Sequence, residues 1–211
     1  MIPSKIKKEI KRILARESWR EDIIQVIRRE GKALHPVFLS CVYDPDETMK
    51  FRAIEAMGIL LSELEDKEFT KEVIRRCMWT LTEESGGIAW GAGEIIGIAC
   101  TTGLDIAEDY LLKLQSYTYE TENHADNYLD YPPLRAGAYW GMAAASSDYP
   151  GILDREILEE SARIEDDRYI LACLKLIFEN EGMAFTGNLD MQEQPDSIKV
   201  YYRGDFRDIY L

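Results

Sequence analysis

Histidine and cysteine are scarce in this chain of 211 residues. Only His35 and His124 are present, which leaves few candidates for acid–base or nucleophilic catalysis. The four cysteines form no CxxC or other zinc-binding spacing, and each lies in an apolar helical pattern that predicts a buried free thiol: Cys41, Cys77, Cys100 and Cys173. We therefore expect no metal, no cofactor and no catalytic residue, and a binding protein in preference to an enzyme.

Long apolar runs are also missing. No stretch approaches the roughly 20 apolar residues that a membrane-spanning helix requires, so we expect no membrane contact. The first residues, MIPSKIKKEIKRI, contain no apolar run typical of a signal peptide. Free thiols fit a reducing compartment, and together these features predict a cytoplasmic location.

Positive charge is in deficit. Lysine and arginine number 25 against 39 aspartates and glutamates, so the net charge is -14. Such a chain repels phosphate backbones, and we expect no nucleic-acid partner. Residues 1–32 are the exception, with ten basic and five acidic side chains. This basic start is either a solvated helix face or a docking handle, for the acidic remainder of the chain or for an acidic partner.

Helical periodicity dominates the pattern of apolar residues. In residues 67–82, apolar side chains recur every four positions and draw one stripe along a helix: Phe69, Val73, Cys77 and Leu81. The sequence predicts helices over residues 3–16, 19–30, 34–43, 47–64, 67–82, 87–101, 105–117, 134–145, 151–163 and 168–180. The fold class that follows is all-α.

Small residues recur along these helices with a period near 40 residues. An alanine stands five positions before a glycine three times, in the pairs Ala53 with Gly58, Ala92 with Gly97, and Ala136 with Gly141. A weaker fourth copy pairs Ala172 with Ile177. Small side chains allow neighbouring helices to approach closely, and stacked hairpins of this kind form a solenoid.

One of these copies resembles a known repeat family. The segment DPDETMKFRAIEAMG is similar to the second half of a HEAT repeat of the type found in phycobilisome-lyase HEAT-like proteins. Met49-Lys50 stand where the family has Val-Arg, and Ala56-Met57-Gly58 stand for Ala-Leu-Gly. The resemblance implies an α-α superhelix, HEAT- or armadillo-like, over residues 1–182. By analogy of fold alone it also suggests handling of a bilin or another tetrapyrrole.

The last residues have a different pattern. In residues 183–211, two β-rich runs, 198–202 and 206–211, flank Arg203-Gly204-Asp205, which predicts a β-hairpin. A lone hairpin is marginal in water, so it is expected to pack on the last helices. It serves there as a cap, or alternatively as a strand that contacts a partner.

The leading hypothesis for function is a scaffold or adaptor that binds a protein or peptide of basic character. The inner helices of the repeats, at about 47–62, 87–101 and 134–146, are expected to line a groove. Its predicted contact residues are acidic and aromatic, with one arginine: Glu55, Trp79, Glu83, Trp90, Glu94, Arg135 and Tyr139. Two alternatives remain open at this point: the tryptophans fill space between repeats, and Arg135 pairs with a neighbouring acid.

The competing hypothesis is an enzyme or cofactor-handling protein with a small-ligand site near residues 86–94 and the long linker 116–131. Gly91-Ala92-Gly93 resembles a dinucleotide loop, but GxGxxG requires glycine where Ile96 stands. Two glycines inside one helix cost on the order of 1–2 kcal/mol, which close approach of another backbone or a ligand can offset. The linker carries acids beside a histidine, so it can be a metal site or a partner contact: His124, Asp126 and Asp130.

Overall fold

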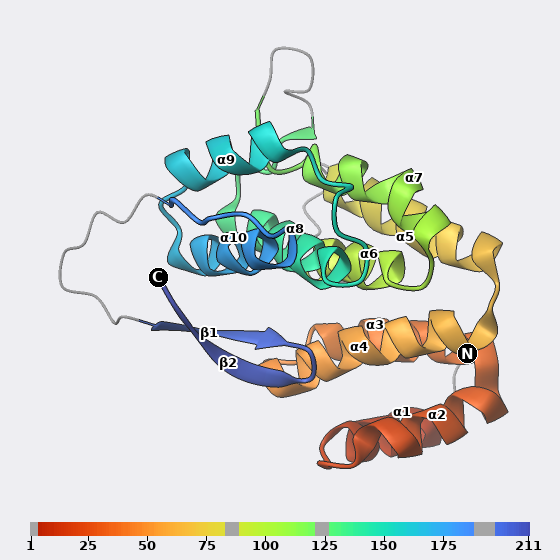
Figure 1. Cartoon of the computed structure of the whole chain (residues 1–211). Helices are drawn as coiled ribbons and strands as arrows, with labels where there is room; N and C mark the ends of the chain where they lie inside the picture. Colours follow the sequence, from red (N-terminus) through yellow and green to blue (C-terminus); the bar gives the residue numbers. More distant parts are fainter. Residues whose placement is uncertain (1–3, 83–88, 121–126, 188–196) are drawn as a thin grey trace. The chain divides into compact units, whose positions relative to one another are not determined.

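The computed structural model describes residues 4–82, 89–120, 127–187 and 197–211. Within them the chain is mostly helical and ends in a two-stranded antiparallel sheet (Figure 1). The predicted helical class and C-terminal hairpin are both confirmed. None of the described helices is both long and apolar enough to cross a membrane. The chain divides into two compact units, Met1–Val73 and Ile74–Leu211, whereas the sequence predicted one boundary after residue 182.

The first unit is built around one long helix. Its elements are α1 (Ser4–Leu14), α2 (Trp19–Glu30), the 3-10 helix η1 (Gly31–Leu34), α3 (His35–Val42), α4 (Glu47–Leu64) and the start of α5 (Lys67–Thr82). α4 packs on α2 and α3. Asp46 caps it by accepting a hydrogen bond from the Met49 amide at 3.1 Å. Arg52 donates to the carbonyl oxygens of Leu14 (2.7 Å) and Arg16 (2.9 Å), which the end of α1 leaves without helical donors.

The basic start of the chain pairs with acids of the same unit. The ion pairs are Lys11 with Asp44, Arg20 with Glu55, Arg28 with Glu63 and Lys32 with Asp66. They join α1, α2 and η1 to α4 and its flanking turns. This arrangement matches the docking-handle interpretation, with the chain's own acids as the target. Because the basic partners are largely exposed, solvent screens these pairs and each contributes little to stability.

The second unit is arranged around α8. After the rest of α5 come α6 (Ala92–Cys100), α7 (Leu104–Gln115), α8 (Pro132–Ser146), α9 (Arg155–Ile164), α10 (Arg168–Asn180), β1 (Ser197–Tyr202) and β2 (Asp205–Tyr210). α8 packs on α6, α7 and α10, and is buried along most of its length (Figure 1). Asp154 and Asp167 cap α9 and α10 with their side chains.

Glycines set the distance between α6 and α8. Gly93 and Gly97 are four residues apart and share one face of α6, as Gly137 and Gly141 do on α8. A Cβ added at Gly97 would collide with the backbone of Gly141, and one at Gly93 would lie 2.6 Å from the Ala138 nitrogen. The two backbones therefore touch, which is the packing role that the repeat pattern predicted for these small residues.

The predicted helix 87–101 begins later than expected. Residues 89–91 are not helical, and α6 starts at Ala92. Gly91 has φ 77°, a left-handed conformation that favours glycine, so it precedes the helix and does not lie inside it. Only Gly93 and Gly97 lie within α6, and the close backbone of α8 accounts for both.

The C-terminal hairpin packs on the helices of its own unit. Tyr202 pairs with Asp205 across a two-residue turn in which Arg203 (φ 51°) and Gly204 (φ 94°) are both left-handed. Trp140 on α8 donates to the carbonyl oxygen of Tyr201, and the Tyr202 hydroxyl donates to Asn180 Oδ1 on α10 at 3.1 Å. The hairpin therefore packs against α8 and α10, and its predicted contact with the last helices is confirmed.

Replacing Gly97 with alanine tests the backbone contact. We expect Gly97→Ala to lower the free energy of unfolding by about 2–3 kcal/mol, because the methyl group forces α6 and α8 apart. Urea unfolding measures the change. Gly103→Ala is the control: its φ of 176° is ordinary, and the added carbon meets only the Asp105 side chain at 2.9 Å. The contact is unimportant if both variants unfold at the same urea concentration.

The buried thiols give a second prediction. Burial raises the pKa of Cys77 and of Cys100 to about 12, and the nearby Glu94 charge contributes at Cys77. Because only the thiolate reacts, neither cysteine should react with Ellman's reagent near pH 8 in the folded protein. Both should react after denaturation in guanidinium. Rapid labelling of either residue in the native state would contradict the fold described.

Candidate functional site

The predicted groove residues lie in different parts of the molecule. Glu55, in the first unit, forms an ion pair with Arg20 at 2.5 Å. Trp79 lies on α5 and is 63% exposed. Trp90 precedes α6 and packs edge-on against Tyr131, with 6.0 Å between ring centroids. Glu83 lies outside the described residues.

Glu94 lies inside the second unit. It is 4% exposed, on α6, and its carboxylate lies directly against Gly137 of α8. The absence of a side chain at Gly137 makes the room that this carboxylate occupies. Its negative charge also contributes to the raised pKa values of Cys77 and Cys173. Glu94 therefore belongs to the interior of the unit.

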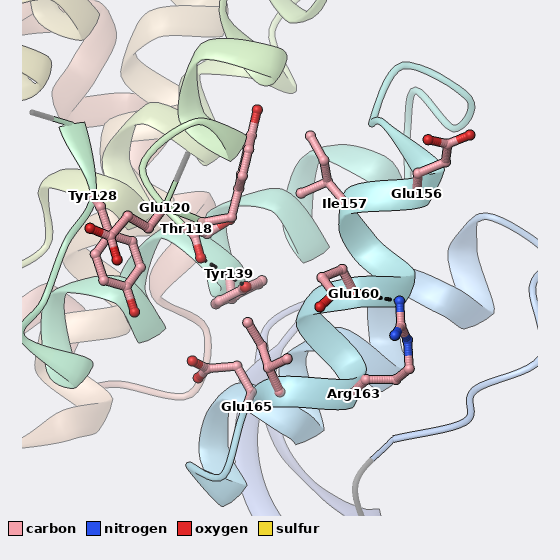
Figure 2. Close-up of a pocket in the computed structure, with 11 residues that line it drawn as sticks. Thr118, Glu120, Tyr128, Tyr139, Glu156, Ile157, Glu160, Arg163 and Glu165 are labelled. Atoms are coloured by element: carbon pink, nitrogen blue, oxygen red, sulfur yellow. Dashed lines mark hydrogen bonds and ion pairs between the residues drawn. The ribbon is translucent and has the colours of Figure 1, made fainter. Parts of the chain in front are cut away.

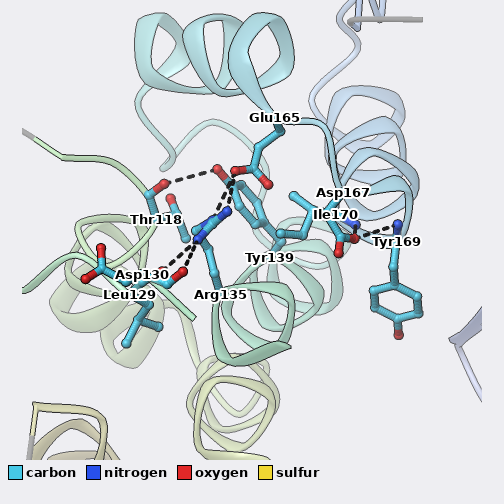
Figure 3. Close-up of polar contacts among 9 residues, drawn as sticks. All are labelled: Thr118, Leu129, Asp130, Arg135, Tyr139, Glu165, Asp167, Tyr169 and Ile170. Carbon is cyan, nitrogen blue, oxygen red and sulfur yellow. Dashed lines mark hydrogen bonds and ion pairs between the residues drawn. The ribbon is translucent and has the colours of Figure 1, made fainter. Parts of the chain in front are cut away.

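Arg135 and Tyr139 are brought together, one turn apart on α8. Arg135 donates to Glu165 Oε1 from Nε (3.0 Å) and Nη2 (2.8 Å), a buried pair just after α9. Its Nη1 donates to the carbonyl oxygens of Leu129 (2.8 Å) and Asp130 (3.3 Å) (Figure 3). The Tyr139 hydroxyl lies 3.4 Å from the Thr118 carbonyl oxygen that it donates to. Arg135 thus pairs with an acid, one of the two roles considered from sequence.

A pocket of about 650 Å³ opens above this network. Figure 2 shows Thr118, Glu120 and Tyr128 on one side, α9 on the other, and Tyr139 between them. Among the described residues, its acidic lining comes from Glu120, Glu156, Glu160 and Glu165, against one lining arginine, Arg163. Tyr119, Tyr128 and Tyr139 supply aromatic surface, and Ile157 and Ile164 supply apolar surface. The pocket is therefore acidic, aromatic and partly apolar.

Buried hydrogen bonds hold the two sides of the pocket in place. The Gln115 side chain, at the end of α7, donates to the Asp154 carbonyl at 2.9 Å and accepts from the Asp154 amide at 2.8 Å. These two hydrogen bonds join the end of α7 to Asp154, the N-cap residue of α9. The Leu129 amide donates to the Tyr117 carbonyl at 3.0 Å, which joins the two ends of the linker. The pocket is therefore formed before any ligand arrives.

Burial shifts the ionisation of the groups beneath the pocket. The pKa of Glu165 is raised above its ordinary value, because loss of solvent outweighs the hydrogen bond from Arg135. Burial also raises the pKa of Tyr139 to about 12, so this phenol stays neutral and acts as a donor. The base of the pocket therefore holds one carboxylate whose charge is incompletely compensated.

The sequence predicted part of this site. It named Arg135, Tyr139 and the tyrosine-rich linker, but not the residues of α9 and its end. Glu156 and Glu160 lie one turn apart, and Ile157 and Ile164 lie off the buried stripe of the helix, with Ile164 61% exposed. Apolar residues outside the buried stripe of α9 are the sequence signal that could have identified this helix as one side of the pocket.

The metal site that the sequence suggested for the linker involves residues that the structure does not describe. His124 and Asp126 lie outside the described residues. Among the residues that are described, no group of three histidines, cysteines or acids could hold a metal ion. Comparisons with protein-family models, with curated proteins and with solved structures found no match to this chain. The function is therefore inferred from the geometry of the pocket.

Removing Arg135 tests the network beneath the pocket. Arg135→Met leaves Glu165 buried without its partner, so we expect a loss of about 3–5 kcal/mol of unfolding free energy near pH 7. A buried carboxyl with a raised pKa destabilises the fold as the pH rises from its ordinary value through the raised one. The loss should therefore shrink toward pH 4, where Glu165 takes up a proton.

Urea unfolding at several pH values measures this dependence. Arg155→Met is the matched control, because Arg155 pairs with Glu159 on the exposed face of the same helix that leads to Glu165. Its cost should stay below about 1 kcal/mol at every pH. A loss for Arg135→Met that is the same at pH 4 and pH 7 would show that the Glu165 charge is not its cause.

Proposed function

We propose that this chain is a binding adaptor that takes a basic segment of a partner protein into the acidic pocket beside α9. The observation that supports the proposal is the composition of the pocket, in which, among the residues that the structure describes, glutamates outnumber the lining arginine and share the surface with tyrosines. A net charge of -14 adds long-range attraction for a positively charged partner.

Each part of the lining suits a basic side chain. Carboxylates on both sides attract its charged end, and they lie in a concave site where water screens them less than on a flat surface. Tyrosine faces attract cations by the cation–π interaction, and Tyr128 already carries Arg135 at 5.3 Å from its ring centroid. Ile157 and Ile164 can cover the methylene stem of a lysine or arginine.

The preformed walls favour binding. The reciprocal Gln115–Asp154 pair and the Arg135 bridge order both sides of the pocket in the free protein. Binding then has little backbone to order on the adaptor's side, which lowers its entropic cost. In contrast, the acidic lining repels anionic ligands, and a tetrapyrrole that carries carboxylates is among them.

The wider architecture stays part of the proposal. A HEAT-like solenoid, its groove and a cytoplasmic location remain predictions from sequence. In a solenoid the pocket beside α9 would be one contact among several along the inner helices, with Trp79 as an exposed aromatic earlier in the chain. The adaptor function requires only the pocket.

A second candidate is the binding of a small organic cation. The pocket's volume of about 650 Å³ lies within the roughly 300–1,000 Å³ typical of small-molecule sites. A polyamine such as spermidine would use the same carboxylates and tyrosines. Spermidine that binds tightly, and that basic peptides cannot displace, would favour this candidate over the adaptor.

A pair of neighbouring glutamates tests the proposal. Glu160 lines the pocket and pairs with Arg163, whereas Glu159 pairs with Arg155 and does not line it. Glu160→Gln should weaken binding of arginine- and lysine-rich peptides about fivefold, because it removes a carboxylate that faces the ligand. Fluorescence anisotropy with labelled peptides measures the affinity.

Glu159→Gln removes the same charge from the same helix and should change the affinity less than twofold. Neutral and acidic peptides of the same length should bind more weakly than the basic peptides. The proposal is wrong if basic peptides fail to bind the wild-type protein, or if the two variants lose affinity equally.

A further inference from the structure

The strongest unassigned feature of the pocket is the carboxylate of Glu165. Its side chain is 8% exposed and contributes to the lining. Both hydrogen bonds from Arg135 go to Oε1. Oε2 is buried and has no hydrogen-bond partner among the residues that the structure describes.

A buried acceptor without a donor is costly. Such an atom loses its hydration without compensation, and the loss is larger for a charged group than for a neutral one. Two other buried side-chain atoms, Arg52 Nε and Glu181 Oε1, also have no hydrogen-bond partner in the described part of the chain. Neither residue lines the pocket, whereas Glu165 combines an unused acceptor with a ligand-sized space.

We infer that the pocket recognises one arginine side chain of the basic segment, whose guanidinium donates a hydrogen bond to Glu165 Oε2. This inference rests on the proposed function and names the group that the site selects. The arginine enters between Tyr128 and α9, with its charged end at Glu165.

Guanidinium fits this surface better than ammonium for two reasons. Its planar fork carries five N–H donors, so a guanidinium that donates to Glu165 still has donors for other acceptors of the lining. Its flat face can lie over an aromatic ring, as the Arg135 guanidinium lies over Tyr128. A lysine ammonium is a compact point charge without this planar face.

Three matched peptides test the inference. Each is a capped glycine–serine peptide with one central residue: arginine, its neutral analogue citrulline, or lysine. Titration of isotope-labelled protein, followed by NMR, gives the affinity and maps the contact. We expect the arginine peptide to shift the amides of residues 118–120 and 156–165, and to bind about tenfold more tightly than the citrulline peptide. The lysine peptide should fall between them.

Equal affinity for arginine and citrulline overturns the inference that a cation is selected. Equal affinity for arginine and lysine overturns the preference for guanidinium. Glu165→Gln should abolish the discrimination between arginine and citrulline, with circular dichroism as the check that it folds. Should that variant not fold, the three affinities of the wild-type protein decide the matter by themselves.

The inference and the proposed function fail in different ways. If arginine- and lysine-rich peptides do not bind at all, the proposed function is wrong. If those peptides bind and Glu160→Gln weakens them, but citrulline binds as well as arginine, the adaptor function stands and only the role of Glu165 is wrong.

Discussion

The second unit depends on the contact between the backbones of α6 and α8. Gly97 and Gly141 leave no room for a side chain, and Gly137 leaves space only for the Glu94 carboxylate. Arg135 and Tyr139 stand two residues before Gly137 and Gly141, which is about 200° around the helix. One face of α8 is therefore fixed against α6, and the opposite face carries the base of the pocket. The position of the candidate pocket therefore follows from a packing contact inside the unit.

The pocket combines rigid walls with incomplete charge compensation. Arg135 binds two carbonyl oxygens of the linker as well as Glu165, so a single guanidinium orders one wall and neutralises part of the base. Arg52 makes a comparable contact in the first unit, where it binds the carbonyls at the end of α1. The two arginines occupy equivalent positions in the repeat pattern. Arg135 lies beneath the acidic pocket, so a residue that orders the structure is also part of the candidate site.

The helices and the hairpin could be predicted well from the sequence, but the contacts between them less well. Apolar periodicity located the helices, and Arg203-Gly204 marked the turn of the hairpin, because both signals are local. The small-residue pattern predicted close packing at Gly97, although not that Gly141 would be its partner. Glu94 was expected in a groove because its position lies off the alanine stripe of the repeat pattern, whereas the missing side chain at Gly137 gives it a place inside. Glu165 was missed because its role depends on a contact with Arg135, 30 residues earlier in the chain. No local sequence pattern indicates such a long-range contact.

Contacts between a bound peptide and the wall of the pocket are the sharpest test of arginine binding beside α9. Intermolecular nuclear Overhauser effects can be measured between the arginine side chain of a basic peptide and the side chains of the protein. We expect contacts from the arginine methylenes to Ile157 and Ile164, and from its guanidinium protons to the Tyr128 ring. Contacts confined to other surfaces, such as the exposed Trp79, would contradict binding beside α9.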